Sequence, residues 1–355
     1  MTDTNTPALR LGVLDQSPIS AGSDAADAFR NTIDLARHTD RLGYHRFWVA
    51  EHHNSDGLAG SAPEILIGQI ASATEQIRVG SGGVMLSHYA PYKVAETFRT
   101  LGALFEGRID LGIGRAPGSD QVTMYALATN RQPTPVDSYP AMVDELIGFL
   151  NDDLDADSPF RDRVRAVPGS RAPSPPVWML ASSPGSAGFA AHFGRPLAYA
   201  HFFGAGDGIA IVDSYRRSYT PSTAHPEPQV NIAVGVICAE TDDEARALAR
   251  SVEGWRAGGL RGPIPHPDHV AEPGPFVVRA QPTGRPPMIV GSPTTVRAGL
   301  DALAVEYQTD EVMVVTIVWD HAARVRSYEL IAQEYQMQPA GSTEAVATGC
   351  QSIEG

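Results

Sequence analysis

The chain has few of the residues that build disulfide frameworks, membrane spans or nucleic-acid surfaces. Only two cysteines occur in 355 residues, Cys238 in an apolar run and Cys350 in a polar tail. They support neither a disulfide framework nor a cysteine-based metal site, and they fit a reducing compartment. No uninterrupted apolar run approaches the roughly 18 residues that a membrane span needs, and the first residues show no secretory pattern. We therefore expect a cytoplasmic protein without a membrane partner.

Basic residues are also scarce. The sequence holds 27 Lys and Arg against 41 Asp and Glu, which gives a net charge of −14. Nucleic acids and anionic lipids are bound by clustered basic residues, so this balance argues against both as partners. Hydrophobic residues make up 43% of the chain, a value ordinary for a globular protein and high enough to exclude disorder throughout.

What is present is a regular alternation of short apolar runs with amphipathic segments. This pattern is typical of βα units in a parallel sheet covered by helices. The apolar runs predict eight strands, within residues 9–15, 46–52, 77–85, 106–115, 177–181, 196–202, 230–237 and 311–319. Helical periodicity predicts helices near residues 25–42, 63–74, 93–105, 136–150, 185–194, 207–219, 242–256, 294–307 and 321–335.

Eight strands in alternation with helices predict a single (β/α)8 TIM barrel spanning residues 1–355. An open doubly wound sheet would need a glycine-rich turn directly after the first strand to bind a dinucleotide, and Leu14-Asp15-Gln16-Ser17-Pro18 contains no glycine. Segments too long for ordinary connections predict insertions at about 116–135, 155–176 and 257–293, the last with the length of an active-site lid, and a mobile tail at 338–355.

Polar side chains follow several of the predicted strands, and in a barrel all such strand ends face the same side. These residues are Asp15, Gln16, Glu51, His52, Arg115, Ser182, Ser183 and His201. The run Glu51-His52-His53 stands out because an aromatic, apolar strand ends in three ionisable groups. From the residues alone, metal binding, loop capping and acid/base catalysis all remain open for this run. Barrel metal sites draw ligands from well-separated strands, so we predict no metal site here.

Two adjacent glycines, Gly82 and Gly83, interrupt the third strand. Glycine weakens a strand interior, so the pair needs a physical reason. A bulge or close approach of a helix is one reason, and a flat ligand lying on the backbone is the other. Spacing favours the first without excluding the second.

Four motifs in order carry a resemblance to a known family. They occupy residues 47–54 (FWVAEHHN), 79–86 (VGSGGVML), 107–115 (GRIDLGIGR) and 178–186 (WMLASSPGS). In this order and spacing the chain resembles the bacterial luciferase-like flavin monooxygenases over residues 9–336. The resemblance implies a TIM barrel and the use of FMN.

The resemblance implies specific roles. His52 matches the active-site histidine that assists the reaction of the flavin 4a-peroxide with substrate, and Glu51 and His201 are second candidates as orienting or substrate-contacting groups. Gly82 and Gly83 match a non-proline cis peptide against the isoalloxazine ring, which reverses the preference drawn from spacing. The residues matching the phosphate site are Arg115, Ser183 and Ser186, with Ser182 beside them.

The implied activity is a monooxygenase that uses FMNH2 and O2 to oxygenate a small organic substrate through a flavin C4a-peroxide. A separate flavin reductase would supply FMNH2, since no second nicotinamide-binding unit is visible. A homodimer is expected through early helices such as residues 62–74. The alternatives are hydride transfer with coenzyme F420 on the same fold and a flavin-binding protein without catalysis. The family match does not identify the substrate.

Overall fold

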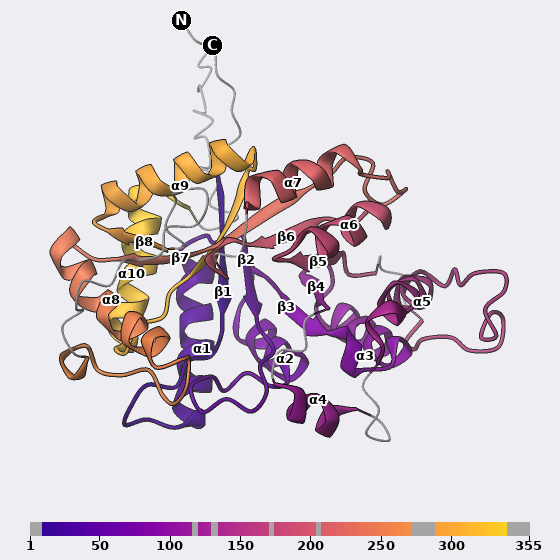
Figure 1. The fold of residues 1–355 in the computed structure, drawn as a ribbon, viewed down its shortest axis with the longest axis horizontal. Helices are drawn as coiled ribbons and strands as arrows, with labels where there is room; N and C mark the ends of the chain where they lie inside the picture. Colours follow the sequence, from indigo (N-terminus) through magenta and orange to yellow (C-terminus); the bar gives the residue numbers. More distant parts are fainter. Residues whose placement is uncertain are drawn as a thin grey trace, which may run out of the picture.

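A computed structural model describes residues 9–115, 120–128, 134–169, 174–203, 207–270 and 288–338. Eight parallel strands form a closed ring (Figure 1). In ring order they are β1 (Arg10–Asp15), β2 (Arg46–Val49), β3 (Arg78–Met85), β4 (Ile109–Gly114), β5 (Val177–Ala181), β6 (Leu197–Ala200), β7 (Val230–Cys238) and β9 (Glu311–Val315). Closure comes from the β7–β9 and β9–β1 pairings. The predicted (β/α)8 TIM barrel is confirmed.

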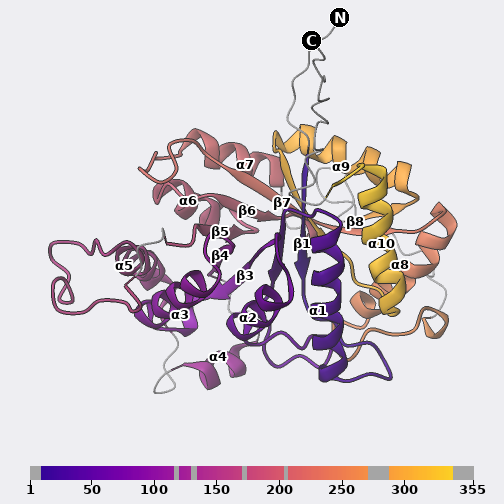
Figure 2. The same cartoon turned by 180° about the vertical axis from the view of Figure 1, so that it is seen from behind.

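Helices cover the outside of the ring, as the two opposite views in Figures 1 and 2 show. They are α1 (Ala25–Arg41), α2 (Pro63–Ala73), α3 (Pro91–Leu104), α4 (Gln121–Leu127), α5 (Tyr139–Asn151), α6 (Pro184–His192), α7 (Gly208–Arg217), α8 (Asp242–Ala257), α9 (Pro293–Tyr307) and α10 (His321–Glu334). Capping boxes start α1 and α8, and proline occupies the first turn of α2, α3, α6 and α9. Both devices satisfy or remove the N–H groups that a helix start leaves unpaired.

The structure corrects three boundaries. A ninth strand, β8 (Met288–Gly291), pairs with the second half of β7, inside the segment predicted as a lid at 257–293. The predicted excursion at 116–135 contains the short helix α4, which Asp120 caps. The second strand ends at Val49, so Glu51 and His52 stand in the following loop. Residues 271–287 of the predicted lid and residues 339–355 of the predicted tail lie outside the described residues.

Two apolar cores share the barrel wall. The larger lies between the strands and the helices. The smaller lies inside the ring, where side chains alternate with those of the outer core, and includes Leu14, Trp48, Trp178 and Met313. Strand alternation therefore assigns every second residue to the barrel interior, where the polar exceptions stand out.

A buried ion cluster occupies the part of the interior near the strand starts. Arg46 bonds Asp110 at 2.6 Å and Glu311 at 3.2 Å, and Trp48 Nε1 donates to Asp110 at 3.0 Å. The Arg46 guanidinium also lies 4.8 Å from the centre of the Trp178 ring. Burial alone would raise the pKa of Asp110, but the Arg46 and Arg78 guanidiniums hold it below its ordinary value. The cluster closes one end of the barrel with paired charges.

Candidate active site

A cavity of about 1200 Å³ opens at the other end of the barrel, where the strands finish. Its inner wall is formed by apolar side chains of the ring, among them Leu14, Trp48, Leu180, Ala233 and Met313. Of the residues predicted from the sequence, it is lined by Gln16, Glu51, His52, Gly82, Arg115, Ser182 and Ser186. Residues from five different strands and loops thus converge on one hollow, as ligand sites in this fold do.

His52 lies on the cavity wall in the loop after β2. Its backbone N–H donates to the carbonyl of Gly60 at 2.7 Å, which fixes the loop. The ring Nδ1 atom is buried and has no hydrogen-bond partner among the described residues. Burial, with a smaller contribution from His53, lowers the pKa of His52 to about 4. The imidazole is therefore neutral near pH 7.

Glu51 is fully buried and collects three hydrogen bonds. It accepts one from Tyr89 Oη at 2.7 Å and one from the backbone N–H of Met85 at 2.9 Å. His53 Nε2 lies 2.7 Å from the same carboxylate. Met85 ends β3, the strand that carries the two glycines, so Glu51 joins the histidine loop to that strand.

The peptide bond between Gly82 and Gly83 is cis, as the resemblance implied. The two glycines meet different neighbours. Gly82 lines the cavity. A Cβ on Gly83 would stand 2.7 Å from the carbonyl oxygen of Gly112 on β4. A Cβ on Gly82 would stand 2.7 Å from Leu14 Cδ1, so close packing accounts for both glycines.

Arg115 follows β4 and faces the first turn of α6. Both terminal guanidinium nitrogens lie 3.9 Å from the position that a Cβ on Gly185 would take. Among the described residues Arg115 forms no ion pair with a carboxylate. Ser183 precedes the first turn of α6 without capping it, and its Oγ lies 3.5 Å from Ser186 Oγ. An uncapped helix start beside an unpaired guanidinium is a suitable site for an anion.

Three predicted strand-end residues have other surroundings. Asp15 forms an ion pair with Arg324 of α10 at 3.1 Å, on the outer side of the ring. His201 is 3% exposed, and its Nδ1 lies 3.0 Å from Tyr307 Oη. The described residues that line the cavity do not include Asp15, His201 or Ser183. Strand-end position alone did not distinguish inward from outward side chains.

The structure also adds residues to the wall that the sequence did not single out. Asn231 of β7 faces the cavity from the ring. Arg256 and Arg261, at and after the end of α8, stand at its mouth. This end of α8 is fixed to the site, because Trp255 Nε1 donates to the carbonyl of Gly262 at 3.0 Å. Inward alternation along β7 was the one sequence signal that pointed to Asn231.

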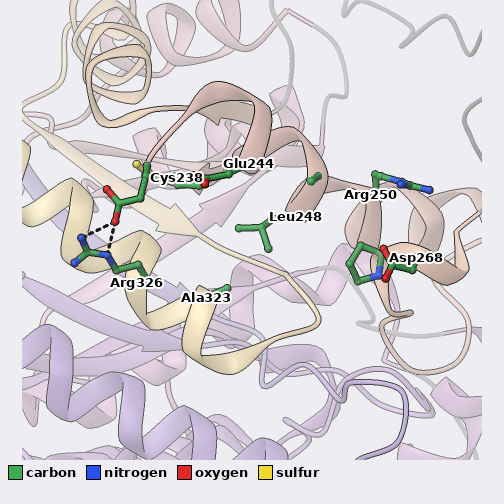
Figure 3. Close-up of a pocket in the computed structure, with 11 residues that line it drawn as sticks. Cys238, Glu244, Leu248, Arg250, Asp268, Ala323 and Arg326 are labelled. Atoms are coloured by element: carbon green, nitrogen blue, oxygen red, sulfur yellow. Dashed lines mark hydrogen bonds and ion pairs between the residues drawn. The ribbon is translucent and has the colours of Figure 1, made fainter.

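A second, smaller hollow of about 390 Å³ lies outside the ring between α8 and α10 (Figure 3). Arg326 and Glu240 form an ion pair at 2.7 Å on its wall. Burial raises the pKa of the Cys238 thiol there to about 12, so this cysteine is not a thiolate at neutral pH. The described residues contain no cluster of His, Cys, Asp and Glu suited to a metal ion, and no described helix is long and apolar enough to cross a membrane.

Comparisons with known proteins show which family the chain resembles. The family model described as luciferase-like monooxygenase matches residues 9–310. A luciferase-like monooxygenase of Escherichia coli (strain K12) is 39% identical over 93% of this chain and 97% of its own. An N-acetyl-S-alkylcysteine monooxygenase of Bacillus subtilis (strain 168) is 36% identical over 91% of this chain and 97% of its own. The crystal structure of apo-MsnO8 is 38% identical, covers 93% of this chain and 99% of its own, and superposes with a TM-score of 0.86.

Proposed function

The chain belongs to the luciferase-like monooxygenase family, and we propose that it is an FMN-dependent monooxygenase that uses FMNH2 and O2 to oxygenate a small organic substrate. The observation that carries the proposal is the convergence of His52, Arg115 and Ser186 on one cavity of about 1200 Å³. Such a cavity is large enough for a flavin ring and a small substrate together.

The phosphate of FMN fits the arrangement around Arg115. A dianionic phosphate needs a cation and N–H donors, and the unpaired guanidinium lies beside the uncapped first turn of α6. Ser182 and Ser186 line the cavity there and offer hydroxyl donors. We propose Ser183 as a further donor at the helix start. Gly82 lines the cavity, and we propose that the flat ring lies against β3 there.

When bound, reduced FMN supplies the two electrons that activate O2, so that one oxygen atom enters the substrate and the other leaves as water. The oxygen-activation route that the resemblance implies is part of this proposal. His52 is the proposed acid/base group. Its neutral imidazole holds a free, buried Nδ1 that can accept or return one proton.

Glu51 is the proposed orienting group. Its carboxylate binds His53, Tyr89 and the end of β3 at once, so it sets the position of the histidine loop relative to Gly82. His201 is hydrogen-bonded to Tyr307 away from the cavity lining, and its predicted contact with substrate stays a prediction.

The exposed charges that line the cavity are of both signs, since Arg256 and Arg261 stand there together with Asp56 and Asp120. Arg256 and Arg261 line the mouth, and neither forms an ion pair with a carboxylate among the described residues. We propose that they bind a carboxylate-bearing organic molecule. The relative that is 36% identical acts, by its name, on N-acetyl-S-alkylcysteine, so N-acetyl-S-ethylcysteine is the first substrate to test.

A separate flavin reductase as electron source, a homodimer and a cytoplasmic location are part of the same proposal. The exposed side chain of Ile65 on α2 offers an apolar contact for a second copy. Size-exclusion chromatography with light scattering tests the dimer, and a single-chain mass would contradict it.

Replacement of His52 by Ala tests the function. We expect FMN binding to stay nearly unchanged while the rate of coupled product formation falls about a hundredfold, the usual range for loss of a general acid/base. The matched control is His225→Ala, which removes a half-buried histidine between α7 and β7, away from the cavity. Equal loss of FMN binding and coupling would make His52 a structural residue.

Two outcomes would replace the proposal. Tight binding of F420 with no binding of FMN would mean hydride transfer with the deazaflavin. FMN retention without product from any substrate tested would mean a flavin-binding protein without catalysis.

A further inference from the structure

Asn231 is an unusual residue in the wall of the cavity. It is the second residue of β7, a strand that is buried along its whole length. Together with Ala233 and Gly235, which follow at alternate positions, it faces the cavity. Its side chain is fully buried, and neither Nδ2 nor Oδ1 has a hydrogen-bond partner among the described residues. Among the described residues, no other buried side chain has two polar atoms without a hydrogen-bond partner.

The adjacent strands give the amide no partner. On β6 the residue in register is Ala198, whose side chain is a methyl group. On β9, Ile232 is in register with Val312 and Ala233 with Met313, which sets Glu311 beside Asn231. The nearest polar groups of the interior are already engaged, since Trp48 Nε1 donates to Asp110 and Glu311 accepts from Arg46. Asn231 thus stands at the border between the ion cluster and the apolar wall of the cavity, without a hydrogen-bond partner from either.

Other buried polar side chains of the ring are hydrogen-bonded to backbone carbonyl groups. Ser81 Oγ donates to the carbonyl of Gly112 at 2.8 Å, and Thr316 Oγ1 donates to that of Val236 at 2.8 Å. A buried amide without partners destabilises a protein, because its desolvation is not compensated. An amide that faces a cavity escapes this penalty when a bound molecule supplies the missing partners.

Resting on the proposed function, we propose that Asn231 is a ligand-recognition residue whose carboxamide pairs with a neighbouring C=O and N–H of the molecule in the cavity. The chemistry required is an amide or imide edge, because Asn offers one acceptor and two donors side by side. The pyrimidine ring of the flavin presents such an edge. The acetamido group of an N-acetylated substrate is a trans amide whose C=O and N–H point in opposite directions, so it can offer the amide only one of the two.

The experiment compares Asn231→Leu with the wild type, with Ser251→Ala as the matched control. Ser251 has a buried Oγ without a partner but does not line the cavity. Without any ligand, we expect Asn231→Leu and Ser251→Ala to unfold at or above the unfolding temperature of the wild type. Each substitution removes a buried polar group that has no hydrogen-bond partner. A clear fall in the unfolding temperature of Asn231→Leu would mean that the protein itself satisfies the amide, and would overturn the inference.

Ligand titrations then identify the partner. If the flavin supplies the edge, FMN and riboflavin will both bind about tenfold more weakly to Asn231→Leu than to the wild type. The affinity of Ser251→Ala for both flavins will equal that of the wild type. If flavin affinity stays unchanged while the KM for N-acetyl-S-ethylcysteine rises about tenfold, a single C=O or N–H of the substrate is the partner, and pairing with an amide or imide edge is overturned. Unchanged values in both titrations would overturn the inference.

The experiment has a defined reading if the variant does not fold and if the wild type does not bind FMN. If Asn231→Leu does not fold, Asn231→Ala replaces it, with the same expected losses of affinity. If wild-type protein binds no FMN, the proposed function fails, while the ligand-free unfolding temperatures still decide whether the amide of Asn231 is unpaired.

Discussion

The polar groups at the two ends of the barrel interior differ in whether they have partners within the chain. Near the strand starts, Arg46, Asp110 and Glu311 satisfy one another within the ring. Around the cavity, His52 Nδ1 and the amide of Asn231 have no hydrogen-bond partners among the described residues, and the half-buried guanidinium of Arg115 forms no ion pair there with a carboxylate. Pairing within the chain marks groups that hold the fold, and its absence at a cavity marks groups that await a ligand.

Removal of charge from the paired end gives the largest expected effect. Asp110→Asn leaves the buried guanidinium of Arg46 without one of its two carboxylates, so we expect a loss of about 3–5 kcal/mol in the free energy of unfolding. Urea denaturation measures it. The control is Asp310→Asn, which breaks an ion pair whose carboxylate is 48% exposed and should cost at most about 1 kcal/mol. A loss of less than about 1 kcal/mol for Asp110→Asn would contradict the comparison.

His52 gives a pH-dependent effect of intermediate size. Its folded-state pKa of about 4 lies below the ordinary value of 6.5. Between these values the unfolded chain binds a proton at this site and the folded chain does not, so stability falls as pH drops from about 6.5 to about 4. His52→Gln should remove this contribution.

The measurement is urea denaturation of both proteins at pH 7 and at pH 4.5. We expect the wild type to lose roughly 2–3 kcal/mol more than His52→Gln between these pH values. His45, whose pKa burial likewise lowers to about 4, is common to both proteins and cancels in the difference. Parallel curves for the two proteins would contradict a buried, neutral His52.

Glu51 combines the features of both ends, since it lines the cavity and yet both of its carboxylate oxygens have hydrogen-bond partners within the chain. Glu51→Gln keeps one acceptor but replaces the other oxygen by an NH2 group, which then faces the Met85 N–H at Oε2 or His53 and Tyr89 at Oε1, so we expect a loss of about 1–3 kcal/mol in unfolding free energy. Tyr89→Phe, which removes a single donor, should cost about 1 kcal/mol. If both variants were as stable as the wild type, the proposed orienting role would be lost.

The smallest effect is expected at the hollow outside the ring. Arg326 is 42% exposed, and Arg326→Ala removes its ion pair with Glu240. Exposed pairs contribute about 0–1 kcal/mol, so the unfolding free energy should change within that range and FMN binding should not change. A loss above about 2 kcal/mol would show that this outer surface carries more of the fold than its exposure indicates.

The sequence predicted the barrel because the alternation of strands and helices is regular, and it placed Gln16, Glu51 and Arg115 at one end because parallel strands finish together. It missed β8, since four apolar residues after a stretch rich in Gly and Pro do not stand out from a loop. It also missed Asn231, because whether a buried amide is paired depends on neighbours from other strands. Such contacts are long-range, and no local pattern reports them.

The most direct test of the central claim is an equilibrium titration of wild-type protein and Arg115→Gln with FMN and with riboflavin, which lacks the phosphate. We expect the variant to keep its stability and its affinity for riboflavin while binding FMN about ten- to a hundredfold more weakly, the loss of a hydrogen-bonded charge. Equal affinities of both proteins for FMN would contradict the claim that the unpaired groups at the strand ends await a flavin.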